Sequence, residues 1–132
     1  MTSHEQFGDG VAKGIAELTA EFGMLGAAPT GDGGARVTLA QVPLPGSLSQ
    51  SHSWIGFLLP YNYDDVQVYG HFVPAELAYA DGRPLQGSGL QAGHAWEGRP
   101  AIKISRNSPR WRAGVDSAVT KVIQVVTWLG GR

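Results

Sequence analysis

Apolar side chains recur at a helical spacing near both ends of the chain. The two stripes, each with a period of about 3.6 residues, predict one helix near each terminus. Asp9 is placed to cap the first helix, and Gly23 or Gly26 to end it. Gly130 and Gly131 are placed to end the second helix. The first stripe comprises Val11, Ile15, Leu18, Phe22 and Leu25, and the second comprises Val115, Val119, Val122, Ile123, Val126 and Leu129.

Between these helices the pattern changes to one that is typical of strands. Residues 36–42 alternate between apolar and polar side chains, which predicts a strand with one buried face. Residues 54–59 are apolar enough for a central strand, and residues 66–73 alternate again. The connections are short, so we expect the three strands to form an antiparallel meander. Residues 102–104 carry a further short strand signal.

The remaining segments carry no clear period. Residues 28–34 are rich in glycine and predict a linker, and residues 76–80 suit either a short strand or a turn of helix. Residues 83–100 form a long glycine-rich stretch that we expect to be irregular. Residues 1–9 are polar, and we expect them to be frayed. Together the pattern predicts a single α+β domain over residues 1–132.

Composition narrows the possible functions. The net charge of −1 gives no reason to expect nucleic acid or an anionic membrane as a partner. The chain has no cysteine, which excludes disulfides, thiolate metal ligands and a cysteine nucleophile. We expect a cytoplasmic protein, because we find no signal peptide and no apolar run of about 18 residues. The four histidines lack ligand spacing, so we predict no metal site and no cofactor.

The stretch 102–116 is the strongest candidate for a functional site. Its strand signal ends at the polar residues Ser105, Arg106 and Asn107. Pro109 then prevents a regular strand from continuing, because its nitrogen carries no hydrogen to donate. Trp111 follows in a predicted loop before the last helix. Functional side chains are often displayed on such loops by a rigid scaffold.

The order of predicted elements and several short motifs resemble a bacterial family of ubiquitin-conjugating-enzyme-like proteins. The resemblance covers roughly residues 36–130 and is strongest over residues 105–116. The matching motifs are Phe57-Leu58-Leu59-Pro60, Tyr63-Asp64, His71-Phe72, Ala80-Asp81-Gly82-Arg83-Pro84, Ser105-Arg106-Asn107 and Trp111-Arg112-Ala113-Gly114-Val115-Asp116. The resemblance implies a fold with an N-terminal helix on an antiparallel meander and a C-terminal helix. It also implies that the partners are a ubiquitin-like protein, an activating enzyme or a sister subunit.

The missing cysteine is the main departure from ubiquitin-conjugating enzymes, because it rules out their thioester chemistry. One hypothesis is that Ser105 accepts the carboxyl terminus of a ubiquitin-like protein as an ester. A serine hydroxyl needs a base within hydrogen-bond reach, and His94 or His71 is a candidate. Asn107 or backbone N–H groups are candidates for holding the oxyanion. The predicted binding residues are Arg106, Trp111, Arg112 and His71.

The second hypothesis is that the fold has lost catalysis and serves as a scaffold that binds the same partners. Each candidate residue then has a structural role. Ser105 and Asn107 are common turn residues. Trp111 is a typical core residue, and His71 suits a packed, hydrogen-bonded position in a strand. A third possibility, a small-ligand binding module, requires an apolar pocket, which the sequence does not reveal.

Overall fold

The computed structural model describes residues 6–132, which form two helices and six strands. The helices are α1 (Asp9–Phe22) and α2 (Ala118–Gly130). The strands are β1 (Leu25–Pro29), β2 (Ala35–Pro43), β3 (His52–Leu59), β4 (His71–Pro74), β5 (Leu90–Trp96) and β6 (Arg99–Ile104).

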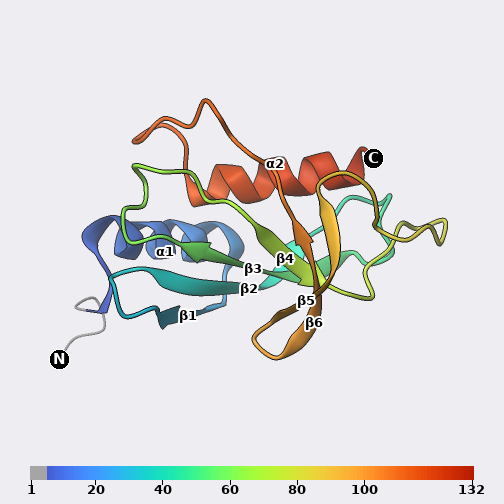
Figure 1. Cartoon of the computed structure of the whole chain (residues 1–132), viewed down its shortest axis with the longest axis horizontal. Helices are drawn as coiled ribbons and strands as arrows, with labels where there is room; N and C mark the ends of the chain where they lie inside the picture. Colours follow the sequence, from blue (N-terminus) through green and yellow to red (C-terminus); the bar gives the residue numbers. More distant parts are fainter. Residues whose placement is uncertain (1–5) are drawn as a thin grey trace.

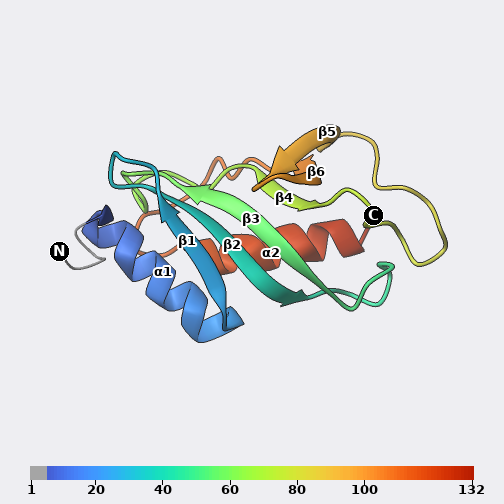
Figure 2. The ribbon, with the colours of Figure 1, turned by 90° about the horizontal axis from the view of Figure 1, so that it is seen from below.

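The strands form one sheet in the order β1-β2-β3-β4-β6-β5, and every neighbouring pair is antiparallel. Both helices pack on the same side of the sheet; in Figure 1, α1 lies above β1 and β2, and α2 runs higher in the view. The hairpin of β5 and β6 lies at the opposite end of the sheet from α1 and β1 (Figure 2). The predicted α+β fold and the antiparallel meander are confirmed.

A row of buried residues runs across the sheet and forms the base of the core. Val37, Phe57, His71, Ile104 and Leu90 are successive Cα partners on β2, β3, β4, β6 and β5. All five are buried, and both helices pack on this side. Antiparallel partners point to the same face of a sheet, so the alternation in the sequence determines which side the helices cover.

Helix α1 packs closely on the segment that follows β3, and its glycines make this approach possible. A Cβ atom at Gly10 would lie 2.2 Å from the Tyr63 carbonyl oxygen, and one at Gly14 would lie 2.8 Å from the Tyr63 ring. The helix ends at Gly23, as predicted. It begins at Asp9 with Gly8 as N-cap and without a side-chain cap, so the predicted Asp9 cap is wrong.

The start of the described chain is more ordered than the sequence indicates. Residues 1–9 are predicted to be frayed, but the Gly8 N–H donates to the Gly33 carbonyl at 2.9 Å. Phe7 packs against the core. Residues 1–5 lie outside the described part of the chain, so the prediction for them stays open.

Helix α2 begins later than its apolar stripe indicates. Ser117 is the N-cap and forms a capping box with Thr120, which satisfies the free N–H groups of the first turn. Val115 lies before the helix and Ile123 lies on its outer side, and both are exposed, so these members of the predicted stripe are wrong. The buried face consists of Ala118, Lys121, Val122, Val125 and Leu129.

The strands differ from the prediction at the edges of the meander. The predicted linker 28–34 begins with the last residues of β1, which pair with β2. The predicted strand 66–73 is reduced to β4, because residues 66–70 leave the sheet and Gly70 has a φ of 86°. The glycine-rich segment 83–100 contains β5 and the start of β6. Most of β5 is exposed, so its sequence lacks the alternation of a half-buried strand.

The β5–β6 hairpin curls over the outer face of the sheet, away from the helices. Trp96 stacks on Phe72 with a centroid distance of 4.9 Å, and its Nε1 donates to the Thr38 hydroxyl at 2.8 Å. The indole lies directly above Gly56, where a Cβ atom would be 2.1 Å from Nε1. Arg36 covers the Trp96 ring at 4.2 Å and pairs with Glu97.

Gly56→Ala is expected to lower the free energy of unfolding by about 2 kcal/mol, because the new methyl group displaces Trp96 and overpacks this layer. Urea denaturation followed by tryptophan fluorescence measures the change. Gly26→Ala is the control, since a Cβ there meets nothing within 4 Å. An equal loss of stability in both variants would contradict the steric explanation.

Candidate functional site

The loop between β6 and α2, residues 105–117, carries the predicted site, and it lies at the top of Figure 1. Ser105 is half-buried directly after β6, and its N–H donates to the Gly89 carbonyl at 2.8 Å. Within the described chain its hydroxyl has no hydrogen bond to a protein group. The backbone of Ser105 is therefore held in place, whereas no hydrogen bond among residues 6–132 holds its side chain.

A glutamine from the segment before β4 holds the next residues of the loop. Gln67 Nε2 donates to Asn107 Oδ1, and Gln67 Oε1 accepts the Ser108 N–H at 2.6 Å. The Asn107 side chain is exposed and directed toward Gln67. One amide therefore fixes two consecutive residues of the loop, one through its side chain and one through its backbone.

A buried lysine supports the same residues from below. Lys121 is 2% exposed, although it carries an ammonium group. Its Nζ donates to the Arg106 carbonyl at 2.6 Å and contacts the Ser108 hydroxyl. Burial and the nearby Arg106 charge lower the pKa of Lys121, and Asp116 opposes this shift. Lys121, with its lowered pKa, thus connects the loop to α2.

Trp111 attaches the loop to the segment that follows β3. Its Nε1 donates to the Asp64 carbonyl at 2.8 Å, and its ring packs edge-on against Tyr63 at 6.4 Å. The Asp64 carboxylate accepts the Gly114 N–H at 2.9 Å, which adds a second bond between the two segments. Arg112 is exposed, and its N–H donates to the Asp116 carboxylate at 2.6 Å.

The structure does not bring His94 to Ser105. His94 lies on β5 opposite Ala101, four residues before Ser105 along β6. At about 3.3 Å per residue, this is a separation of about 13 Å along the strand. The imidazole is exposed and packs against Phe72 on the outer face of the sheet, whereas Lys121 lies beneath the inner face.

His71 lies next to the loop but inside the core. It is 1% exposed, pairs with Ile104, and contacts the Phe57 ring at a centroid distance of 5.1 Å. Neither ring nitrogen has a hydrogen-bond partner among residues 6–132. Burial, followed by the positive charge of Lys121, lowers the pKa of His71 from 6.5 to about 3. His71 is therefore a neutral, packed core residue, but it lacks the hydrogen bonds that the structural alternative in the sequence predicts.

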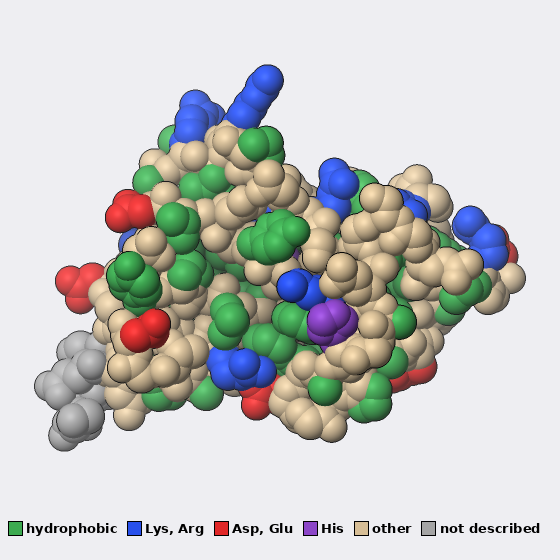
Figure 3. Space-filling model, in the orientation of Figure 1, with side chains coloured by type: hydrophobic (Ala, Val, Ile, Leu, Met, Phe, Trp, Pro, Cys, Tyr) green, Lys and Arg blue, Asp and Glu red, His purple; other side chains and the backbone are tan. Residues whose placement is uncertain are grey.

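Arginine side chains surround the loop. Arg106, Arg110 and Arg112 are exposed, and Figure 3 shows Lys and Arg side chains gathered over the loop between β6 and α2. Arg106 also stacks on Trp128 at 4.5 Å, and Arg132 covers the same ring at 4.7 Å. A small hollow of about 80 Å³ lies between the loop and α2. Its lining includes Arg106, Asn107, Ser108, Lys121 and Trp128.

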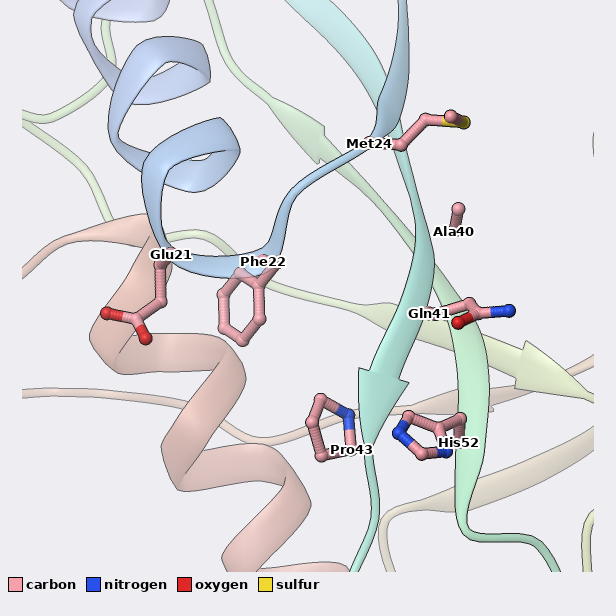
Figure 4. Close-up of a pocket in the computed structure, with 7 residues that line it drawn as sticks. All are labelled: Glu21, Phe22, Met24, Ala40, Gln41, Pro43 and His52. Atoms are coloured by element: carbon pink, nitrogen blue, oxygen red, sulfur yellow. The ribbon is translucent and has the colours of Figure 1, made fainter.

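A larger groove of about 480 Å³ lies elsewhere, at the end of α1 beside β2 and the start of β3. Its titratable side chains are Glu21 and His52, which lie on opposite sides of the groove (Figure 4). The groove therefore shows no convergent set of polar groups. It also lies apart from the loop that the sequence singles out.

Sequence reasoning missed three residues that organise this site: Gln67, Ser108 and Lys121. Lys121 occupies an inward position on α2, one turn after Ala118 and one turn before Val125. A lysine at a position that helical spacing places in the core is a signal that the sequence alone could have provided. Gln67 reaches Ser108 across 41 residues, and no local pattern indicates such a contact.

Comparison with known protein families identifies the chain. The profile of prokaryotic E2 family E matches residues 28–131. This range includes the end of β1, all the other strands, the β6–α2 loop and α2. The chain belongs to this family. Membership indicates a role in ubiquitin-like protein conjugation, with a ubiquitin-like protein and an activating enzyme as the general kinds of partner. Searches of curated proteins and of solved structures found no significant match.

The family assignment confirms the resemblance read from the sequence, and the α+β fold is consistent with an E2-like domain. Neither helix of the described chain has the length and apolar character that crossing a membrane requires.

We predict that His71 makes stability depend on pH. The unfolded chain binds a proton near pH 6.5, whereas folded His71 does so only near pH 3. Its contribution is therefore complete above pH 6.5 and is lost as the pH falls toward 3, at about 1.4 kcal/mol per pH unit. In His71→Leu this slope should disappear. Urea denaturation between pH 7 and pH 4.5 measures it, and parallel curves for the two proteins would contradict the prediction.

Proposed function

We propose that this chain is a cysteine-free E2-type component that receives the carboxyl terminus of a ubiquitin-like protein as an ester on its β6–α2 loop. The observation that carries the proposal is that the loop presents two serines that do not cap α2, Ser105 and Ser108, on a backbone held from both sides. Gln67 holds the loop from the segment before β4, and Lys121 holds it from α2. The family membership supports the pathway, and the absence of cysteine requires a different acceptor.

Chemistry at this loop requires an acceptor, a base and an oxyanion donor. Ser105 and Ser108 are the available hydroxyl groups, and both are half-buried. The Asn107 side-chain amide is exposed between them, so its N–H groups can serve as donors to a developing oxyanion. The sequence favours Ser105 as acceptor, but His94 lies about 13 Å from it along the strand, and His71 has its pKa lowered by burial.

Binding would use the exposed side of the same loop. Arg106 and Arg112 are positioned to contact acidic or carbonyl groups of a partner. Trp111 fixes the loop through Asp64 and Tyr63, so its part in binding would be to hold the arginines in place.

A scaffold without catalysis is the second candidate, because one surface feature favours it. Val115 is 60% exposed beside Arg112, so the loop presents an apolar side chain within a cationic surface. Such a mixture suits a protein–protein contact. The apolar stripe of α1 is less suitable, since Leu18 is fully buried and Ile15 packs against the core.

The proposal predicts that the protein, mixed with a neighbouring-gene activating enzyme, its ubiquitin-like protein and ATP, forms a covalent adduct that hydroxylamine removes. Intact mass spectrometry before and after hydroxylamine measures the adduct. The double variant Ser105→Ala/Ser108→Ala should lose it, because the one serine that remains in the loop, Ser117, has its hydroxyl bonded to the Thr120 N–H as the cap of α2. Ser88→Ala is the matched control, since it removes an exposed hydroxyl close to the loop but outside it.

The alternative outcomes are distinct. An adduct that survives hydroxylamine is an amide, which places the acceptor on a lysine and refutes the ester. If no adduct forms but the protein co-elutes with the activating enzyme or the ubiquitin-like protein on a sizing column, the scaffold function is supported instead.

A further inference from the structure

A hydroxyl and an amine meet beneath the β6–α2 loop. Lys121 Nζ contacts the Ser108 hydroxyl and also donates to the Arg106 carbonyl at 2.6 Å. A nucleophile and a base within hydrogen-bond reach are the geometric signature of an activated serine, and lysine acts as the base in some enzymes of this kind. Ser105 has no comparable neighbour within the described chain.

The charged and titratable groups around Lys121 favour its neutral form. Arg106 faces it from the loop and His71 faces it from β4, and Asp116, two residues before α2, is the one acidic group among residues 6–132 that acts on it. No carboxylate of the described residues lies within ion-pair distance of its Nζ. Burial and the Arg106 charge lower the pKa of Lys121. A neutral amine can accept a proton, which an ordinary surface lysine cannot do near neutral pH.

Ser108 is held in a fixed position and reaches a small hollow. Its N–H donates to Gln67 Oε1 at 2.6 Å, and its carbonyl accepts the Trp111 N–H at 3.1 Å. Ser108 and Lys121 both line the hollow of about 80 Å³, with Asn107 and Trp128 at its sides. This volume admits a small acyl group, such as a carboxyl-terminal residue with no large side chain.

We propose that Ser108 is the acyl acceptor of this protein and that Lys121 is its general base. The proposal rests on the proposed function, and it names the residues of that site. The substrate is a carboxyl-terminal thioester, with a small residue at the reacting end.

The reaction balances without another reagent. In the deprotonated form of Lys121, which the lowered pKa favours, the Ser108 Oγ attacks the thioester carbonyl carbon and its proton moves to the Lys121 Nζ. The C–O bond forms, the C–S bond breaks, and the departing thiolate takes the proton back and leaves as a thiol. The Asn107 amide lies beside the hollow, where it can donate to the oxyanion of the intermediate.

The probe for the test is a small one, the N-acetyl-glycylglycine thioester of 2-mercaptoethanesulfonate, used with the full chain. Intact mass measures acylation, and fragmentation locates the acyl group. We expect a hydroxylamine-sensitive adduct on Ser108 that Ser108→Ala reduces at least 100-fold. Ser88→Ala should leave it unchanged. An adduct on Ser105 or on Lys121, or a wild-type rate no higher than that of Ser108→Ala, would overturn the proposal.

Lys121 is tested by the dependence of the rate on pH. In the wild type the rate should rise with pH and level off below pH 10.5, the ordinary pKa of lysine, because the Lys121 pKa is lowered. Lys121→Met should reduce acylation about 100-fold and remove this plateau, since general-base catalysis typically contributes about 10²–10⁴-fold.

A cysteine at position 108 distinguishes a purely structural role of Lys121 from its proposed role as a base. Ser108→Cys ionises without a base, so Ser108→Cys/Lys121→Met should react within about 10-fold of Ser108→Cys if the loop is intact. An equal loss in the serine and cysteine backgrounds would mean that Lys121 only holds the loop, and the proposal would fail. If the probe acylates Ser108 but the activating enzyme does not load the protein, the roles of Ser108 and Lys121 are supported and the proposed conjugation function is refuted.

Discussion

Tyr63 is the contact on which the arrangement of both helices and the loop depends. Its ring meets α1 at Gly14, its hydroxyl accepts the Ala118 N–H at the start of α2 at 2.7 Å, and Trp111 packs against its edge. Burial raises the pKa of Tyr63, so the hydroxyl stays neutral. Because Ala118 begins α2, this bond also sets where Lys121 lies, one turn further along. Packing against Tyr63 therefore positions the candidate site, although Tyr63 itself does not contact the proposed reacting groups.

The interior beneath the loop holds two basic side chains that are 1% and 2% exposed, His71 and Lys121. A buried ammonium group is costly unless polar atoms surround it, and the loop supplies the Arg106 carbonyl and the Ser108 hydroxyl. The positive charge of Lys121 also disfavours protonation of His71, which contributes to the lowered pKa of His71. The conformation of the loop and the protonation of the core are consequently coupled. A structure that needed only a stable core would do better with an apolar residue at position 121.

The sequence predicts those parts of the fold that bury a regular face. Both helices and the central strands follow from periodicity, because Val37, Phe57 and Ile104 point into one core. The β5 strand does not follow, because it is largely exposed and the packing of its Trp96 depends on Gly56, which lies on β3 and is distant in sequence. The site shows the same division. A proline and a polar break locate the loop, whereas a contact that spans 41 residues holds the Ser108 backbone and one that spans 13 residues gives its hydroxyl a partner.

Because the chain lacks cysteine, the contact between Lys121 and Ser108 bears on how a hydroxyl could replace a thiol. A thiol in a conjugating enzyme ionises readily and needs little help from its neighbours, whereas a serine hydroxyl requires a base that can reach it. An E2-like fold that replaces the thiol must therefore provide a proton acceptor next to the new hydroxyl. Histidine, the usual base, is placed on the wrong face at position 94 and has its pKa lowered by burial at position 71. Lys121 lies in hydrogen-bond contact with Ser108, and the same burial that weakens its charge makes it able to accept a proton.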